Sequence, residues 1–232
     1  MSTQFWKRTI DILMIVLFIV LMGCSFTGDV VHECLGMLLF AMFVVHHILN
    51  GAWYRTLVNR WRSPRQFVLA FMTVVLFVIM ITMAISSVLV SRTLFAFIDY
   101  DGGLFARQFH QMSTHLGLIL AAIHFGIYGK RFFPGFRQMN NVQTTARKAI
   151  RLVFILLISA ICVYGIVSSF RHDIGDKLLM RQAYSFWSGS RILFFVDYVA
   201  VFVLYAVIAY VVEHILFPRI EKDKKTEIER FE

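Results

Sequence analysis

Residues 67–90 read FVLAFMTVVLFVIMITMAISSVLV, an apolar run of 24 residues without one charged side chain. An α-helix rises about 1.5 Å per residue and the hydrocarbon core of a bilayer is about 30 Å thick, so this run can cross a membrane. Five further apolar runs of about 20 residues or more occupy 9–27, 31–50, 109–128, 148–169 and 190–217. The sequence therefore predicts an all-α polytopic membrane protein, a bundle of six transmembrane helices.

The composition supports this class. Of 232 residues, 59% are apolar and only 16% are charged, and the mean hydropathy is +0.71. Soluble domains average about 25% charged residues, so a water-soluble globule or a disordered chain does not fit. The three cysteines form neither CxxC nor CxxCH, which argues against a disulfide framework and against covalent c-type haem. We expect one membrane domain over residues 1–217 and a charged cytoplasmic tail over 218–232.

Most of the positive charge lies in alternate connecting segments. Lys and Arg number 17 in the N-terminal segment, the 51–66 loop, the 129–151 stretch and the tail, against six in the remaining loops. Lys and Arg concentrate on the cytoplasmic side of membrane proteins, so both termini are predicted to lie in the cytoplasm. Topology also accounts for the net charge of +9, and we expect no nucleic-acid partner.

The start of the chain allows one alternative. Lys7 and Arg8, followed by an apolar run and Cys24, loosely resemble a bacterial lipoprotein signal. Met22 fits that cleavage pattern poorly, and removal of the run would leave five spans, which contradicts the charge distribution. We therefore expect the first span to be retained.

Two pairs of histidines lie in the second and fourth runs, where ionisable side chains are costly and usually functional. His32 and His46 are 14 residues apart, and so are His110 and His124. Fourteen helical steps return to within about 40° of the same face and rise about 21 Å. Both helices would cross in the same direction, so His32 would meet His110 near the outer surface. His46 would likewise meet His124 near the inner surface.

Facing imidazoles at two depths are the ligand set of two bis-histidine b-type haems, each iron taking one axial nitrogen from each helix. We therefore predict two haems b whose iron ligands are His32, His110, His46 and His124. Gly36, one turn from His32, and Gly117, midway along the fourth run, would let a porphyrin or a neighbouring helix approach closely.

Alternative roles remain open for the histidines. The four ligand candidates could instead be packing residues bonded to backbone carbonyls. His47 competes with His46, because it lies 15 residues from His32 and is rotated about 60° the other way. His115, nine residues from His124, points to the opposite face, as a hydrogen-bonding residue near the outer haem, a quinol contact or a structural residue. His172 and His214 have no partner in register, and we expect them to be structural.

Several stretches resemble a known family. They read HECLGMLLFAMFVVHHILNGAWY from residue 32, RQFHQMSTHLGLILAAIHFGIYG from 107, VYGI from 163 and SFWSGSRILFFVDY from 185. This pattern resembles the flavinylation-associated cytochromes, whose hallmark is H-E-x-x-G…H-x-x-x-N on one span and an H…H pair on a later one. The resemblance extends over nearly the whole chain, and the two histidine-bearing spans are its most specific part.

The resemblance implies a role for each matching residue. His32, Glu33, Gly36, His46 and Asn50 occupy the first motif, and His110 with His124 occupies the second. The H-x-x-x-N spacing selects His46 over His47, although the doubled histidine departs from the family pattern. Members of the family are taken to bind haem b and to pass electrons across the bacterial cytoplasmic membrane, often beside covalently flavinylated extracytoplasmic domains.

We therefore expect transmembrane electron transfer through two stacked haems, from a cytoplasmic or quinol donor to an extracytoplasmic flavoprotein or other redox partner. Menaquinone or ubiquinone, membrane lipid and further copies of the chain are the other candidate partners. Candidate groups for the haem propionates are Arg107, Arg92 and Tyr100 outside and Arg55, Trp53, Lys130 and Arg131 inside. These basic residues could equally serve only to set the orientation. Glu33 could orient an imidazole or relay a proton, and Asp197 could belong to a quinol site or cap a helix.

Two rival classes remain. One is a quinol-oxidising or ferric-reductase-like membrane subunit of a redox enzyme. The other is a small non-redox transporter, which would have helices broken by Gly or Pro at mid-membrane. Pro64, Pro134 and Pro218 all lie in loops or at span ends, which argues against the transporter. No Ser-His-Asp arrangement, phosphate-binding Gly loop or HExxH zinc motif is present, so any chemistry on a substrate is expected on a partner or a bound quinol.

Overall fold

The computed structural model describes residues 3–57, 64–98, 103–128, 145–182, 184 and 187–217, and every regular element within them is a helix. The long helices are α1 (Thr3–Leu21), α3 (Asp29–Leu49), α6 (Pro64–Val90), α7 (Gly103–Tyr128), α9 (Thr145–Arg171) and α11 (Arg191–Leu216). The short helices are α2 (Cys24–Thr27), α4 (Ala52–Arg55) and α10 (Ile174–Leu178). The predicted all-α class is therefore confirmed, and each predicted apolar run overlaps a long helix.

The first apolar run differs from its prediction, because it is not one helix to residue 27. Helix α1 ends at Leu21, and α2 starts only after a turn at residues 22–23. A Cβ atom at Gly23 would lie 2.9 Å from the tip of the Phe195 ring of α11, so the turn passes close to a distant helix. Periodicity within the run does not show such a contact.

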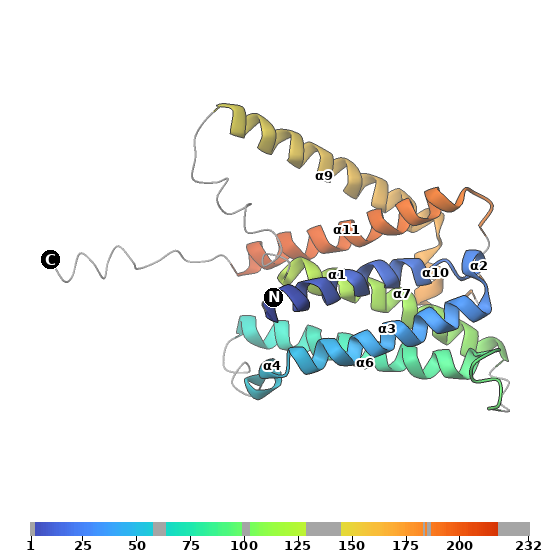
Figure 1. The fold of residues 1–232 in the computed structure, drawn as a ribbon. Helices are drawn as coiled ribbons and strands as arrows, with labels where there is room; N and C mark the ends of the chain where they lie inside the picture. Colours follow the sequence, from blue (N-terminus) through green and yellow to red (C-terminus); the bar gives the residue numbers. More distant parts are fainter. Residues whose placement is uncertain are drawn as a thin grey trace.

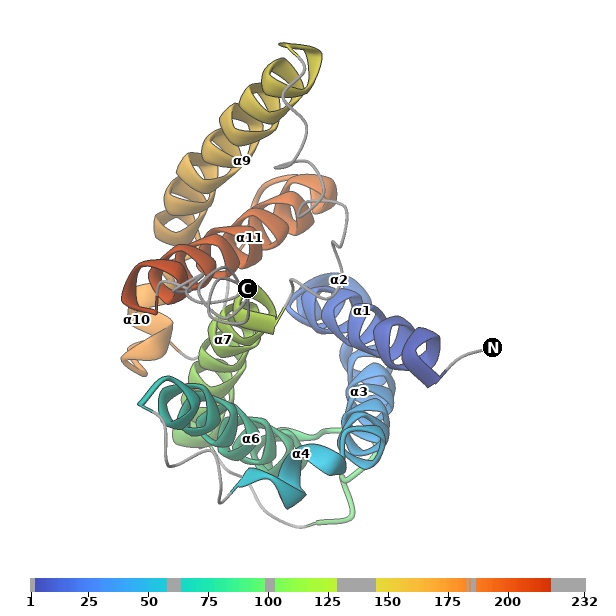
Figure 2. The ribbon, with the colours of Figure 1, turned by 90° about the vertical axis from the view of Figure 1, so that its left-hand side faces the viewer.

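The long helices lie side by side and alternate in direction (Figure 1). Helices α1, α6 and α9 run one way, and α3, α7 and α11 return, so α1 begins at the same end of the bundle at which α11 ends. Viewed from that end, α1, α3, α6, α7 and α11 surround a common interior, and α9 lies outside against α11 (Figure 2). Helices α3 and α7 therefore run in the same direction on opposite sides of the interior.

Helix α11 is held by close backbone contacts at two glycines. A Cβ atom at Gly126 of α7 would lie 2.1 Å from the carbonyl oxygen of Ala206, and one at Gly165 of α9 would lie 2.6 Å from that of Ala200. Small residues at such crossings let helices in lipid approach until their backbones touch. Arg65, at the start of α6, also forms an ion pair with the buried carboxylate of Glu213 on α11.

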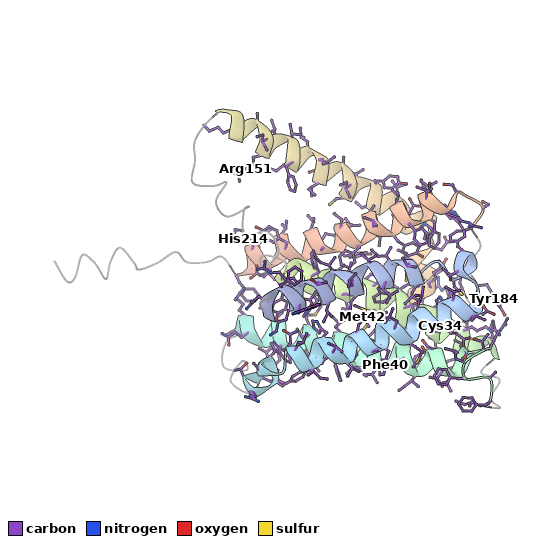
Figure 3. All side chains as sticks on the ribbon, in the orientation of Figure 1. Cys34, Phe40, Met42, Arg151, Tyr184 and His214 are labelled. Atoms are coloured by element: carbon purple, nitrogen blue, oxygen red, sulfur yellow. The ribbon has the colours of Figure 1, made fainter. Side chains whose placement is uncertain are left out.

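Four of the described helices are long and apolar enough to cross a membrane: α3, α6, α9 from Lys148, and α11. Their outward faces carry large apolar side chains, such as Val163 on α9, which is 62% exposed. Figure 3 shows this outward display, with Arg151 on the part of α9 that leans away from the bundle. Exposed apolar surface on this scale indicates contact with lipid rather than water. The chain is therefore an all-helical protein suited to a membrane.

Candidate functional site

The outer histidine pair meets across the interior of the bundle. His32 on α3 and His110 on α7 have ring centroids 6.5 Å apart, with the ring planes at 83° to each other. A metal–imidazole bond of about 2 Å places each ring centroid about 3 Å from the metal, so two axial imidazoles on one metal have centroids about 6 Å apart. The observed separation fits a single metal between the two rings.

The surroundings of these rings also fit a bound group. His110 Nδ1 lies 3.0 Å from the hydroxyl of Ser86 on α6, a residue with no exposed surface. That bond holds the ring through Nδ1, so Nε2 is the nitrogen that could bind a metal. His32 Nδ1 is buried and has no hydrogen-bond partner among the described residues. A buried, unpaired ring nitrogen is costly in a protein interior, and a bound group would remove that cost.

Glu33, beside His32, binds the turn that follows α6. Its carboxylate accepts hydrogen bonds from the backbone N–H groups of Arg92, Thr93 and Leu94, at 2.8, 3.2 and 2.7 Å. The hydroxyls of Ser91 and Thr93 add bonds of 2.7 and 2.6 Å. These contacts fix the start of α3 to the chain that follows α6, and the two roles predicted for Glu33, orienting an imidazole or relaying a proton, stay predictions.

The inner histidines line one cavity. His46 and His47 from α3 and His124 from α7 line one cavity of about 150 Å³. Most of the remaining wall is apolar and comes from all five helices of the bundle interior: Met14, Ile15, Phe18, Leu39, Phe43, Leu76, Phe77, Met80, Ala121, Phe125 and Phe202. An apolar wall with a few imidazoles suits a mostly apolar ligand.

His46 and His47 have different partners. His46 Nδ1 lies 2.6 Å from the carboxylate of Asp11 on α1. His47 Nδ1 bonds the hydroxyl of Tyr54 in α4, and its ring packs edge-on against Phe43 at 4.2 Å between centroids. Asp11 was not among the residues predicted for the site. A carboxylate inside the apolar run from residue 9 was the signal that could have identified it.

Other motif residues have local packing roles. The Asn50 side chain donates to the backbone carbonyl of His46 at 2.9 Å and so completes the end of α3. A Cβ atom added at Gly117 would lie 3.2 Å from the Phe18 ring of α1, whereas a Cβ atom added at Gly36 would meet nothing within 4 Å. Gly117 is thus explained by helix packing, and Gly36 borders open space on the His32 side of α3.

The basic candidates lie at the ends of the bundle. The Arg107 guanidinium sits over the Tyr184 ring, 5.6 Å from its centroid. Figure 3 places Tyr184 at the end of the bundle opposite His214. Arg92 and Arg55 are exposed. Trp53 packs against Tyr54 at 5.2 Å between ring centroids. Three further candidates, Tyr100, Lys130 and Arg131, lie outside the described residues, as does the 218–232 tail.

His115 does not line the cavity with His124, in agreement with its predicted place on another face of α7. Its Nδ1 lies 2.8 Å from the carbonyl oxygen of Gln111, and its Nε2 lies 3.0 Å from the hydroxyl of Tyr198 on α11. Both ring nitrogens are therefore engaged by the protein, and the ring is only 4% exposed. These contacts support the structural role among those considered for His115.

Asp197 on α11 is the centre of a second polar cluster. Its carboxylate, with no exposed surface, accepts hydrogen bonds from Tyr164 at 2.5 Å, Ser168 at 3.0 Å and Arg171 at 3.1 Å. His172 Nε2 lies 3.0 Å from the same carboxylate. This cluster ties the end of α9 to α11 and gives His172 the structural role expected for it. His214 stacks parallel to Tyr210 at 6.1 Å, one turn away on α11.

Lys177 in α10 is buried, which the sequence did not predict. It is only 3% exposed although it lies in a connecting segment. Burial, the dominant cause, lowers the pKa of its ammonium group from 10.5 to about 8, with Asp173 acting in the opposite direction. A lysine between two predicted spans reads as a topology signal, and nothing in the sequence separates a buried one from an exposed one.

In the described part of the chain, no three His, Cys, Asp or Glu side chains group so as to hold a metal ion. A bis-histidine haem requires only two protein ligands, the arrangement seen for His32 and His110, whereas His46 and His124 are related by lining the same cavity. Comparison of the chain with family models, curated proteins and solved structures gives no match.

Proposed function

We propose that this chain is a membrane cytochrome of the flavinylation-associated type, which holds two haems b and passes electrons across a bacterial cytoplasmic membrane. His32 and His110 would hold the outer haem, and His46 and His124 the inner one. A haem b between two imidazoles supplies a one-electron Fe(III)/Fe(II) couple. The donor is a quinol or a cytoplasmic reductant, and the acceptor is an extracytoplasmic redox protein, in this family often a flavinylated one.

The observation that carries the proposal is the meeting of His32 and His110. The two residues are 78 positions apart in the chain and sit on different helices, yet their rings lie 6.5 Å apart across the bundle interior. This separation is also that of an edge-to-face ring pair, and what favours axial ligands over packing is the buried ring nitrogen of His32 that has no partner among the described residues.

The inner pair follows the same helices. His46 and His124 each lie 14 residues after their outer counterparts, about 21 Å further along parallel helices. Both line the same cavity, whose wall is mostly aromatic and aliphatic. An apolar surrounding reduces solvent rearrangement when charge moves, which favours electron transfer between two fixed positions.

The proposal includes six transmembrane helices with both termini in the cytoplasm. Helices α1 and α7 fall outside the four that qualify by length and composition. Helix α1 carries Lys7, Arg8 and Asp11, and α7 carries three histidines among other polar residues. Both nevertheless lie alongside the other long helices for their whole length (Figure 1). In this proposal, the site requires the polar residues of α1 and α7, and these residues lower the mean hydropathy of both helices.

The proposal is tested by comparing two histidines of α7 that differ in orientation. We expect His110→Ala to abolish about half of the haem in the purified protein, because the outer iron loses one of two axial ligands. His115→Ala, the matched control, should retain both haems, because that ring bonds Gln111 and Tyr198 instead. Haem content per chain, measured optically after purification in detergent, gives the result. Loss of haem in the His115 variant with full retention in the His110 variant would contradict the assignment.

A further inference from the structure

A carboxylate on a third helix binds one of the inner histidines. Asp11 lies two turns into α1, in the apolar stretch that begins at Ile10, and both it and His46 line the inner cavity. The Oδ1 atom of Asp11 lies 2.6 Å from His46 Nδ1, within hydrogen-bond distance. The side chains are 26% and 24% exposed, so water only partly screens the contact.

We propose that Asp11 is the positioning residue of the inner haem site, which makes His46 rather than His47 the iron ligand and lowers the reduction potential of that haem. The inference rests on the proposed function and adds to it a residue that neither the sequence pattern nor the histidine register identifies.

The choice of ligand follows from hydrogen-bond chemistry. An ionised carboxylate only accepts hydrogen bonds, so His46 must carry its proton on Nδ1 and present an unprotonated Nε2, the form that binds a metal. The partner of His47 is the Tyr54 hydroxyl, which both donates and accepts and therefore leaves the tautomer of His47 undetermined. The His47 ring is also packed edge-on against both Phe43 and Phe77, which resists its reorientation.

The effect on potential follows from charge. A carboxylate bonded to the far nitrogen of an imidazole raises its basicity as a ligand, and it adds negative charge near the iron. Both effects favour Fe(III) over Fe(II). Neutralising Asp11 should therefore make the inner haem easier to reduce, whereas the outer haem, about 21 Å away along the helices, should be affected much less.

The outer site shows the same arrangement with a weaker partner. His110 Nδ1 bonds the neutral hydroxyl of Ser86 on α6, so no carboxylate contacts that ring among the described residues. His46 and His110 are thus each held through Nδ1 by a side chain of another helix, α1 or α6, that carries no proposed ligand. The difference between carboxylate and hydroxyl would give the two haems unequal potentials, with the inner haem lower.

The test is a redox titration of the full-length protein in detergent, followed at the haem absorption bands, for wild type and three variants. Asp11→Asn should raise the reduction potential of one of the two haems and leave that of the other unchanged. The shift is about 59 mV for each tenfold change in the ratio of the site's affinities for ferric and ferrous haem. Asp11→Glu should restore most of the wild-type value. Tyr54→Phe, the matched control, should shift neither wave, because His47 is not a ligand.

The outcomes separate the two proposals. Loss of the inner haem in Asp11→Asn, with retention in Asp11→Glu, would also support positioning, and the unchanged outer wave reports that the protein is folded. Two unchanged waves in Asp11→Asn, or a shift in Tyr54→Phe alone, would overturn the role of Asp11. A wild-type protein without b-type bands would instead overturn the proposed function itself.

Discussion

At the scale of single residues, the proposed ligands and their partners come from different helices. The ligands lie on α3 and α7, whereas Asp11 on α1 and Ser86 on α6 bind the far ring nitrogens of His46 and His110. Each of these imidazoles is thereby fixed by a helix that supplies no ligand, which is the usual way a protein orients a metal-binding ring. Glu33 adds a further constraint by binding the turn after α6.

Lys177 provides a prediction on stability at this scale. Its pKa is lower in the folded protein than in the unfolded chain, so folding below pH 8 requires a buried charge that costs stability. We expect Lys177→Met to stabilise the protein by up to about 3 kcal/mol at pH 7, and the gain to shrink as the pH rises from about 8 towards 10.5. Thermal unfolding in detergent across this pH range measures the gain.

Lys148, which is exposed near the start of α9, serves as the control for this experiment. Lys148→Met removes the same charge from the surface and should show no comparable change with pH. A gain for Lys177→Met that stays constant across the pH range, or a loss of stability at pH 7, would contradict the burial of the Lys177 ammonium group.

At the scale of helices, α7 poses the main problem for a sequence-based assignment. It lies on the bundle interior and carries His110, His115 and His124, yet its composition keeps it out of the four membrane candidates. The imidazoles and amides of α7 explain this exclusion, because they lower its mean hydropathy while neighbouring helices shield it from lipid. Eight residues of α7 are buried, among them Ser113 and His115.

The crossing of the membrane by α7 can be measured with reporter fusions. We expect alkaline phosphatase fused after residue 98 to be active outside the cytoplasm, and the same enzyme fused after residue 128 to be inactive, because α7 returns the chain to the cytoplasm. Fusions after residues 57 and 98, which flank the strongly apolar α6, are the control and should also differ. Equal activity after residues 98 and 128 would mean that α7 does not cross.

At the scale of the whole molecule, the elements were predictable and the contacts between them only in part. Apolar runs located every long helix, and the equal direction of the two histidine-bearing spans predicted that His32 meets His110, which is confirmed. The turn at Gly23, the Asp11–His46 bond and the burial of Lys177 were not predicted. Each depends on which helices become neighbours, and periodicity within one helix carries no information about that.

The bundle also explains why the site lies where it does. Helices α3 and α7 run parallel on opposite sides of an interior that α1, α6 and α11 complete (Figure 2). A planar group between α3 and α7 would be surrounded by apolar side chains from the other three helices, such as Phe18, Phe77 and Phe202 of the cavity wall. Helix α9 adds apolar surface on the outside, and none of its described side chains lines the cavity.

The most direct test of the account is the haem content of the wild-type chain, purified in detergent from cells with ample haem. Two non-covalent haems per polypeptide, with b-type bands that sharpen on reduction with dithionite, are the expected result. A colourless protein, or one haem per chain in a correctly folded preparation, would contradict two histidine pairs that each bind an iron.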